Sequence, residues 1–341
     1  MMEPIYWNFD TIEISFLGYL SVEIQEQLDE ARARAEAERR DALIYLGEHE
    51  VPVKVAESGM KGGYRYRFDT GEDGATWFVR RHDKEDWNIR VSVKSLTLAL
   101  YGYEGAKAQI IEMLERLDVK KKEEADPETG EIIDHPLERV SRLDYCIDFQ
   151  TDNFEPERQA FLAHSRTKNN FTYPDNVVTT GRGIIYAKIG KMPSRQVVIY
   201  DKKRDITECG KDFWWKIWGI DPESHDKQIW RVEVRAGKKE LNKWNLRRFS
   251  DFENKAGDVV LSILQNIKYV IPNENDKNPT RWPIAPFWKK AQNIAKNKLS
   301  SFSTNAKRGE IIAEMREKKR QIFEQHMLGM VAPLSIARGY E

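Results

Sequence analysis

The chain has 341 residues and carries 55 basic and 55 acidic side chains, so its formal net charge is zero. This length suits one large or two moderate domains, and the neutral balance argues against general coating of nucleic acid through a basic excess. Two cysteines argue against a disulfide framework and against a zinc cluster. No basic segment followed by an apolar run opens the chain, and no stretch approaches the roughly 20 apolar residues of a membrane span. We therefore expect a cytoplasmic protein without a membrane partner.

The first 120 residues are predicted to begin with a strand, followed by a helix. Residues 9–20 have the pattern of a strand, and residues 21–47, rich in Glu, Ala and Arg, have the pattern of a long helix. Three strands and a second helix are expected next, at 63–69, 76–82, 87–95 and 105–118. The charged stretch 121–139, with Pro-Glu-Thr-Gly in its middle, predicts an exposed hairpin or a linker.

The same order of elements recurs between residues 140 and 270. The expected elements are a strand, a helix, three strands and a helix, at 141–149, 155–165, 183–189, 195–203, 229–236 and 257–268. We therefore predict an α+β fold of two pseudo-repeated strand–helix–three-strand–helix halves with antiparallel sheets. We expect residues 1–120 to hold DNA and residues 140–270 to be catalytic. Residues 271–341 are predicted to form a basic, helical C-terminal region.

Three predicted strands of the second half carry polar side chains at alternate positions. A strand sends successive side chains to opposite faces, so residues two apart share a face. The alternating sets are Arg142, Asp144, Cys146 and Asp148, then Gln196, Val198, Tyr200 and Lys202, and then Arg231, Glu233 and Arg235. If the three strands pair in one sheet, one face gathers three carboxylates, a tyrosine, a lysine and three arginines, while the other is mostly apolar.

Asp144, Asp148 and Glu233 are candidate ligands for a divalent cation. Mg²⁺ and Mn²⁺ prefer oxygen ligands and commonly take one or two carboxylates together with substrate phosphates. Three carboxylates on one face repel one another unless a cation lies between them. The alternative is that each carboxylate pairs with an arginine of the same pattern.

Tyr200 is the candidate nucleophile. A tyrosine with an ordinary pKa near 10 attacks poorly, but a metal that polarises the phosphate and a lysine such as Lys202 would make attack feasible. The alternative is that Tyr200 is a half-buried sheet aromatic. Tyr186, in the adjacent predicted strand, is a rival nucleophile.

Other features favour contact with nucleic acid less directly. Arg65, Arg67, Arg90 and Lys94 in the first half suit an anionic backbone. The aromatic cluster 214–218 could stack bases, although such clusters more often close a hydrophobic cap. The sequence contains neither a His-hydrophobic-His triplet nor a Walker A loop, which argues against a histidine-ligated nuclease site and against ATPase activity.

Three segments resemble the ordered motifs of the Rep_trans replication initiation factor family. They are Arg142–Asp148 (RLDYCID), Val198–Lys202 (VIYDK) and Trp230–Arg235 (WRVEVR). Members of that family initiate rolling-circle replication of plasmids, or act as relaxases of integrative conjugative elements. They nick one DNA strand at an origin and stay joined to its 5′ phosphate through a tyrosine, with a divalent metal.

By position, the resemblance implies Tyr200 as nucleophile, Asp144, Asp148 and Glu233 as the acidic set, and Lys202 and Arg231 as phosphate contacts. Arg142 and Arg235 are expected to contact DNA beside them. The implied cofactor is Mg²⁺ or Mn²⁺, and the implied partners are double-stranded origin DNA and single-stranded DNA. A host helicase and a homodimer are further candidates. A conjugative relaxase and a non-catalytic DNA-binding regulator of the same fold remain as alternatives.

Overall fold

The computed structural model describes residues 2–82, 86–121, 135–164, 171–174, 176–180, 183–302, 317, 320–321, 323–327 and 329–330. Eleven strands form one sheet in the order β10-β11-β12-β13-β7-β1-β6-β5-β4-β3-β2, and all of the strand pairs described are antiparallel. Their bounds are β1 Glu3–Phe16, β2 Ala42–Leu46, β3 Val51–Val55, β4 Tyr66–Asp69, β5 Ala75–Val79, β6 Ile89–Val93, β7 Glu138–Thr151, β10 Asn176–Thr180, β11 Gly183–Gly190, β12 Arg195–Asp201 and β13 Gln228–Gly237. A second sheet joins β14 (Ile267–Tyr269), β8 (Phe161–His164) and β9 (Phe171–Thr172). The predicted α+β class with antiparallel strand pairing is confirmed, and strands from both halves of the sequence join in one large sheet.

The long strands β1 and β7 pair at the centre of the large sheet. Strands from the first half of the sequence lie on the β1 side, and strands from the second half lie on the β7 side. In each half the last strand of the series, β6 or β13, lies next to the first strand. This order is compatible with the pseudo-repeat, which stays a prediction.

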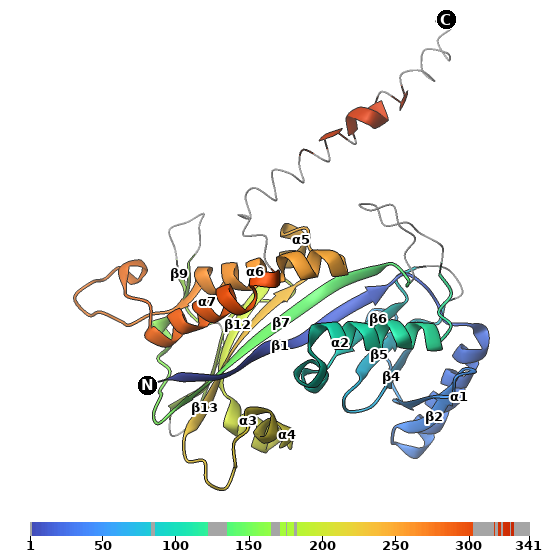
Figure 1. Cartoon of the computed structure of the whole chain (residues 1–341), viewed down its shortest axis with the longest axis horizontal. Helices are drawn as coiled ribbons and strands as arrows, with labels where there is room; N and C mark the ends of the chain where they lie inside the picture. Colours follow the sequence, from blue (N-terminus) through green and yellow to red (C-terminus); the bar gives the residue numbers. More distant parts are fainter. Residues whose placement is uncertain are drawn as a thin grey trace, which may run out of the picture.

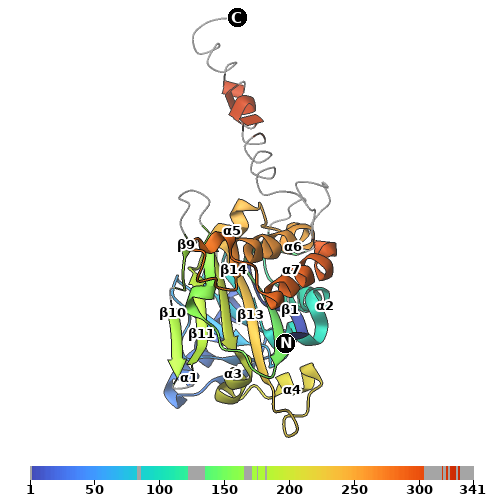
Figure 2. The ribbon, with the colours of Figure 1, turned by 90° about the vertical axis from the view of Figure 1, so that its left-hand side faces the viewer.

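Helices cover the apolar face of the large sheet. The helices are α1 Val22–Glu38, α2 Ser95–Arg116, α3 Lys202–Cys209, α4 Phe213–Trp218, α5 Lys238–Lys243, α6 Phe249–Asn266 and α7 Pro286–Lys298, with short 3₁₀ turns at Arg158–Ala160, Pro279–Arg281 and Ser300–Phe302. Figures 1 and 2 show α6 and α7 on one side of the central strands and α3 and α4 on the other. Within the described ranges, α3 and α4 are the helices on the polar face, and they cover it only locally.

The core follows from the alternation along the central strands. In β1, Ile12, Ile14 and Phe16 are buried, while the residues between them are only half-buried. The ring of Phe9 lies 4.9 Å from the ring of Phe252 on α6, which places that helix against the apolar face. Burial of large aromatic side chains is the main favourable term for such packing.

Several predicted elements differ from the observed ones. The predicted helix at 155–165 is wrong, because Arg158–Ala160 is a 3₁₀ turn and β8 follows it directly. The predicted helix at 21–47 ends at Glu38, with Arg39 in the left-handed region, and β2 follows. The strand predicted at 195–203 ends at Asp201, whose side chain accepts a hydrogen bond from the Arg204 backbone N–H (3.0 Å) and caps α3.

The C-terminal region is partly core. Trp288 on α7 is buried, and its indole N–H donates to the backbone carbonyl of Leu264 on α6 (3.0 Å). Most of residues 303–341, which belong to the predicted basic, helical C-terminal region, lie outside the described residues. Most of the stretch predicted as a hairpin or linker at 121–139 lies outside them too. Within the described ranges, the chain has no helix that is both long and apolar enough to cross a membrane.

Candidate active site

The three patterned strands are neighbours, in the order β12-β13-β7. Arg231 lies opposite Asp148 on β7 and opposite Tyr200 on β12. Two strand positions further along, Glu233 lies opposite Cys146. The structure therefore brings Tyr200, Arg231, Glu233, Asp144 and Asp148 together on one face, because residues paired across antiparallel strands share a face.

Asp148 and Arg231 form a buried bidentate ion pair. The Arg231 Nε and Nη2 atoms donate to the two carboxylate oxygens of Asp148, at 2.6 Å and 2.8 Å. Asp148 is 0% and Arg231 1% exposed. The Arg231 Nη1 atom donates to Asp10 on β1 (2.7 Å), so one guanidinium is shared by two carboxylates.

Helices α3 and α4 close over this ion pair. The indole N–H of Trp218 donates to Asp148 Oδ2 (2.9 Å), and the Trp214 ring lies 4.2 Å from the Arg231 guanidinium carbon. Trp214 and Trp218 are both buried. The aromatic cluster 214–218 therefore forms a cap over the ion pair, which agrees with the alternative to base stacking.

Tyr200 lies beside Glu233. Its hydroxyl donates to Glu233 Oε2 (3.1 Å), while the other oxygen of that carboxylate accepts from Arg235 Nε (2.7 Å). Burial, followed by the charge of Glu233, raises the pKa of Tyr200 well above its ordinary value. Burial also acts to raise the pKa of Glu233, but Arg235 and Arg231 outweigh it and hold that pKa below its ordinary value. The tyrosine is thus protonated, with its proton directed at an ionised carboxylate.

Tyr186 faces Tyr200 from the next strand. The two residues are register partners on β11 and β12, and their ring centroids lie 6.5 Å apart. Both side chains are half-buried. Burial raises the pKa of Tyr186 as well, although Arg235 opposes this effect. The geometry places two tyrosines at the site, and both remain candidate nucleophiles.

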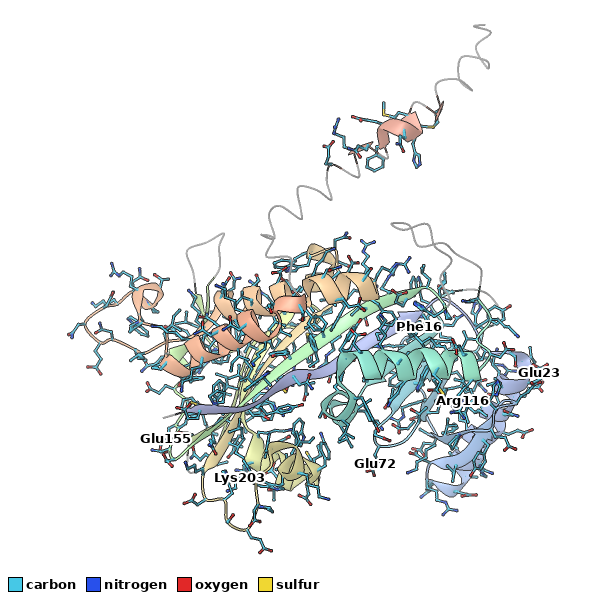
Figure 3. All side chains as sticks on the ribbon, in the orientation of Figure 1. Phe16, Glu23, Glu72, Arg116, Glu155 and Lys203 are labelled. Atoms are coloured by element: carbon cyan, nitrogen blue, oxygen red, sulfur yellow. The ribbon has the colours of Figure 1, made fainter. Side chains whose placement is uncertain are left out.

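Lys202 reaches the site from α3, because it is the first residue of that helix rather than part of β12. Its ammonium pairs with Asp205 (2.7 Å) and lies 5.6 Å from the centre of the Tyr200 ring. Burial, and after it the charge of Arg231, lowers the pKa of Lys202. Figure 3 labels its neighbour Lys203 at this end of the molecule, far from Arg116 and Glu23.

Asp144 lies further along β7, and Arg142 donates to its carboxylate through Nε (3.0 Å) and Nη2. Arg235 lies 3.9 Å from the same carboxylate. Burial, the largest cause, and the charge of Glu233 raise the pKa of Asp144 to about 7, although both arginines lower it. Arg142 and Arg235 keep 28% and 25% of their side chains exposed, so these two arginines line the open part of the face.

The carboxylates do not fit a metal site in this arrangement. Asp148, Asp144 and Glu233 each bind an arginine, as the alternative to a metal site predicted. Within the described parts of the chain, no group of three or more His, Cys, Asp or Glu side chains is placed to hold a metal ion. A bound cation would have to displace guanidinium groups from these carboxylates, so we derive no step through a metal.

The first-half basic residues are mostly paired. Arg90 binds Glu13, Lys94 binds Asp69 (2.6 Å) and Arg65 binds Asp29 (2.8 Å). Among the described residues, no carboxylate pairs with the exposed Arg67. These residues therefore present less free positive charge than their sequence suggests.

Asp10 is a site residue that the sequence pattern does not single out. A β-bulge between Phe9 and Thr11 leaves Asp10 without a register partner on β7. The bulge turns its side chain toward Arg231 and breaks the regular alternation of β1. A strand pattern with a strict period of two along residues 9–20 therefore does not identify Asp10 as a site residue. Burial raises the pKa of Asp10, while Arg231 lowers it.

Comparison with known proteins gives little beyond this geometry. No family model matches the chain, and no curated protein matches it. One solved structure that aligns with it is a rolling circle replication initiator protein from Geobacillus stearothermophilus. The alignment covers 85% of this chain and 96% of the other, at 18% sequence identity and a TM-score of 0.43. A likeness at that level carries neither fold nor activity across, so the proposal below depends on this chain's own residues.

Proposed function

We propose that this chain is a replication initiator of the Rep_trans type, which nicks and rejoins one DNA strand at the origin of a rolling-circle plasmid, phage or integrated element. The observation that carries the proposal is the Tyr200 hydroxyl, hydrogen-bonded to Glu233 on a polar sheet face lined by arginines. The resemblance of the three motifs to that family supports it. Double-stranded origin DNA and single-stranded DNA are the expected partners.

The proposed reaction is a transesterification at phosphorus. The Tyr200 oxygen attacks a phosphodiester, and its proton passes to Glu233. The bond from phosphorus to the 3′ oxygen breaks, and the departing oxygen takes up a proton to give a 3′-hydroxyl. The 5′ phosphate stays on Tyr200 as a phosphodiester, so the free energy of the broken bond is retained and the reverse reaction closes the strand.

The arginines divide into two roles in this proposal. Arg142 and Arg235, which are partly exposed, contact the phosphate and stabilise its developing charge. Arg231 is 1% exposed and donates to two carboxylates, so it acts as a positioning residue that holds Asp148 and Asp10. This assignment differs from the expectation that Arg231 contacts the phosphate directly.

The test uses supercoiled DNA of the replicon that carries this gene. Wild-type protein should nick it and leave a denaturant-resistant protein–DNA adduct, and Tyr200→Phe should abolish the adduct with little effect on DNA affinity. Tyr45→Phe, at an exposed position on β2, is the matched control. Adduct formation by Tyr200→Phe but not by Tyr186→Phe would transfer the nucleophile's role to Tyr186.

Metal dependence is tested in the same assay. The family resemblance predicts that chelator stops nicking and that Mg²⁺ or Mn²⁺ restores it. Unchanged nicking in chelator would show that the carboxylates serve as arginine partners only.

A non-catalytic DNA-binding regulator is the second candidate. The observation in its favour is that the carboxylates are paired with arginines and that both tyrosines have raised pKa values. A mobility shift on origin DNA without nicking in any metal would establish it. A conjugative relaxase would share the chemistry and differ in the DNA it nicks.

A further inference from the structure

A group of arginines and aromatic side chains lies around β4 and β5, on the half of the sheet remote from Tyr200. Its members, which we call the distal basic patch, are Arg32, Tyr64, Arg65, Arg67, Phe78, Arg80 and Arg81. Four of them, together with the loop at 59–63, line a cavity of about 510 Å³. None of these side chains takes part in the site around Tyr200.

Among the residues that the structure describes, the distal basic patch has more arginines than carboxylates that pair with them. Asp29 accepts from Arg65 (2.8 Å) and lies 3.1 Å from Arg81, and Asp86 lies 3.6 Å from Arg80. Arg32 donates to the backbone carbonyl of Glu57, and this carbonyl group is uncharged. Five arginines thus meet two carboxylates among the described residues. Within the described parts of the chain, Arg32 and Arg67 are the two of these five that have no carboxylate partner.

The patch is held in shape by its aromatic side chains. The Arg80 guanidinium lies 5.0 Å from the centre of the Tyr64 ring, and that ring meets Phe78 edge-on at 6.3 Å. The loop before Tyr64 is folded tightly, because a Cβ at Gly59 would lie 2.0 Å from the Tyr64 carbonyl oxygen. Arg65 and Arg81 keep 42% and 57% of their side chains exposed. Fixed, exposed guanidinium groups suit the bidentate recognition of phosphate.

The sheet links the patch to the candidate active site. Phe78 lies opposite Arg67 and Arg90, and Arg90 lies opposite Ser15 on β1, so these residues share the polar face. Strand β5 is five inter-strand spacings from β12, which is roughly 24 Å at about 4.8 Å each. That span corresponds to about seven base pairs of B-form DNA.

We propose that the distal basic patch binds the phosphate backbone of the DNA duplex that flanks the strand cleaved at Tyr200. The identity of the nucleic acid rests on the proposed function, whereas the charge and shape of the patch do not. A duplex fits better than a single strand, because the patch presents mainly guanidinium groups for phosphates and one face of its Tyr64 ring is occupied by Arg80.

The test measures binding of the full chain to a fluorescein-labelled duplex of arbitrary sequence, by anisotropy over a series of salt concentrations. Arg67→Gln/Arg81→Gln removes two phosphate contacts and should lower the salt slope by about two, with weaker binding at every salt concentration. Arg116→Gln, at the C-terminal end of α2 and labelled in Figure 3, is the matched control and should change nothing. Arg67→Gln alone should lower the slope by about one, and it removes no ion pair within the described chain.

An unchanged slope in the double variant, or an equal loss in Arg116→Gln, would overturn the proposal. So would a loss seen with a single strand of the same length and not with the duplex. Melting temperatures of all variants show whether the fold is kept, and Arg67→Gln decides the question if the double variant is unstable. The binding assay needs no chemistry, so the two proposals can fail separately. Wild-type protein that binds the labelled duplex through the patch but forms no adduct on supercoiled DNA of its replicon would refute the nicking proposal alone.

Discussion

Replacing Asp148 with alanine tests whether this carboxylate is a structural ion-pair partner or a metal ligand. Asp148 is buried and accepts two hydrogen bonds from Arg231 and one from Trp218. Its removal leaves the buried Arg231 with Asp10 as its remaining carboxylate partner and leaves an indole N–H without an acceptor. Breaking a buried pair in this way costs about 3–5 kcal/mol, a large part of the roughly 5–15 kcal/mol that stabilises a typical protein.

The assay is urea unfolding in the presence of chelator, followed by tryptophan fluorescence. Asp148→Ala should lose about 3–5 kcal/mol of unfolding free energy. Asp152→Ala is the control, because Asp152 is 76% exposed and 3.7 Å from Lys227. It should lose less than about 1 kcal/mol. Asp148→Ala/Arg231→Met removes both charges of this pair but leaves Asp10 without Arg231, so it should recover only part of the loss.

The result that would refute the structural role of Asp148 is the one expected if Asp148 is a metal ligand. A carboxylate whose main role is to bind a cation adds repulsion to the metal-free protein, so its removal would leave stability in chelator unchanged or higher. A loss below about 1 kcal/mol in Asp148→Ala, with stabilisation of the wild type alone by Mg²⁺, would therefore contradict the structural reading.

The remaining predictions concern the pH dependence of folding, the cap and the C-terminal helix. The pKa of Asp144 is raised to about 7 in the folded state, so the folded protein binds this proton more tightly than the unfolded chain does. The contribution of Asp144 to stability therefore falls as pH rises from about 4 to about 7. Asp144→Asn should lack this fall, and melting temperatures measured across that pH range check it. If the wild type instead gains stability relative to the variant as pH rises, the arginines outweigh burial and the pKa of Asp144 is lowered. Trp218→Phe keeps an aromatic ring but removes the donor to Asp148, and should lose about 1.5–3 kcal/mol of unfolding free energy in urea. Trp288→Ala should lose about 3–5 kcal/mol, because Trp288 on α7 is buried; an unchanged melting temperature would mean that α7 is dispensable to the core.

The sequence by itself determined the polar face. Alternation of Arg142, Asp144 and Asp148, and of Arg231 and Glu233, depends only on the two-residue period of a strand. Any sheet that pairs these segments in register gathers their side chains on one face. Several strands of the sheet were predictable for the same reason, but the pairing of β1 with β7, which joins both halves in one sheet, was not. The helix predicted at 155–165 failed, because a short apolar run cannot be assigned to helix or strand by period alone.

Only the tertiary structure decided which of these side chains form ion pairs and hydrogen bonds with one another. Whether a carboxylate meets an arginine or leaves room for a cation depends on strand order and register, which bring Asp148 onto Arg231 and Glu233 beside Arg235 and Tyr200. A single bulge adds Asp10, and the change from strand to helix at Asp201 places Lys202 and the tryptophan cap at the site. These contacts join residues that lie 33 to 221 positions apart in the chain, and local patterns of two or four residues carry no information about them.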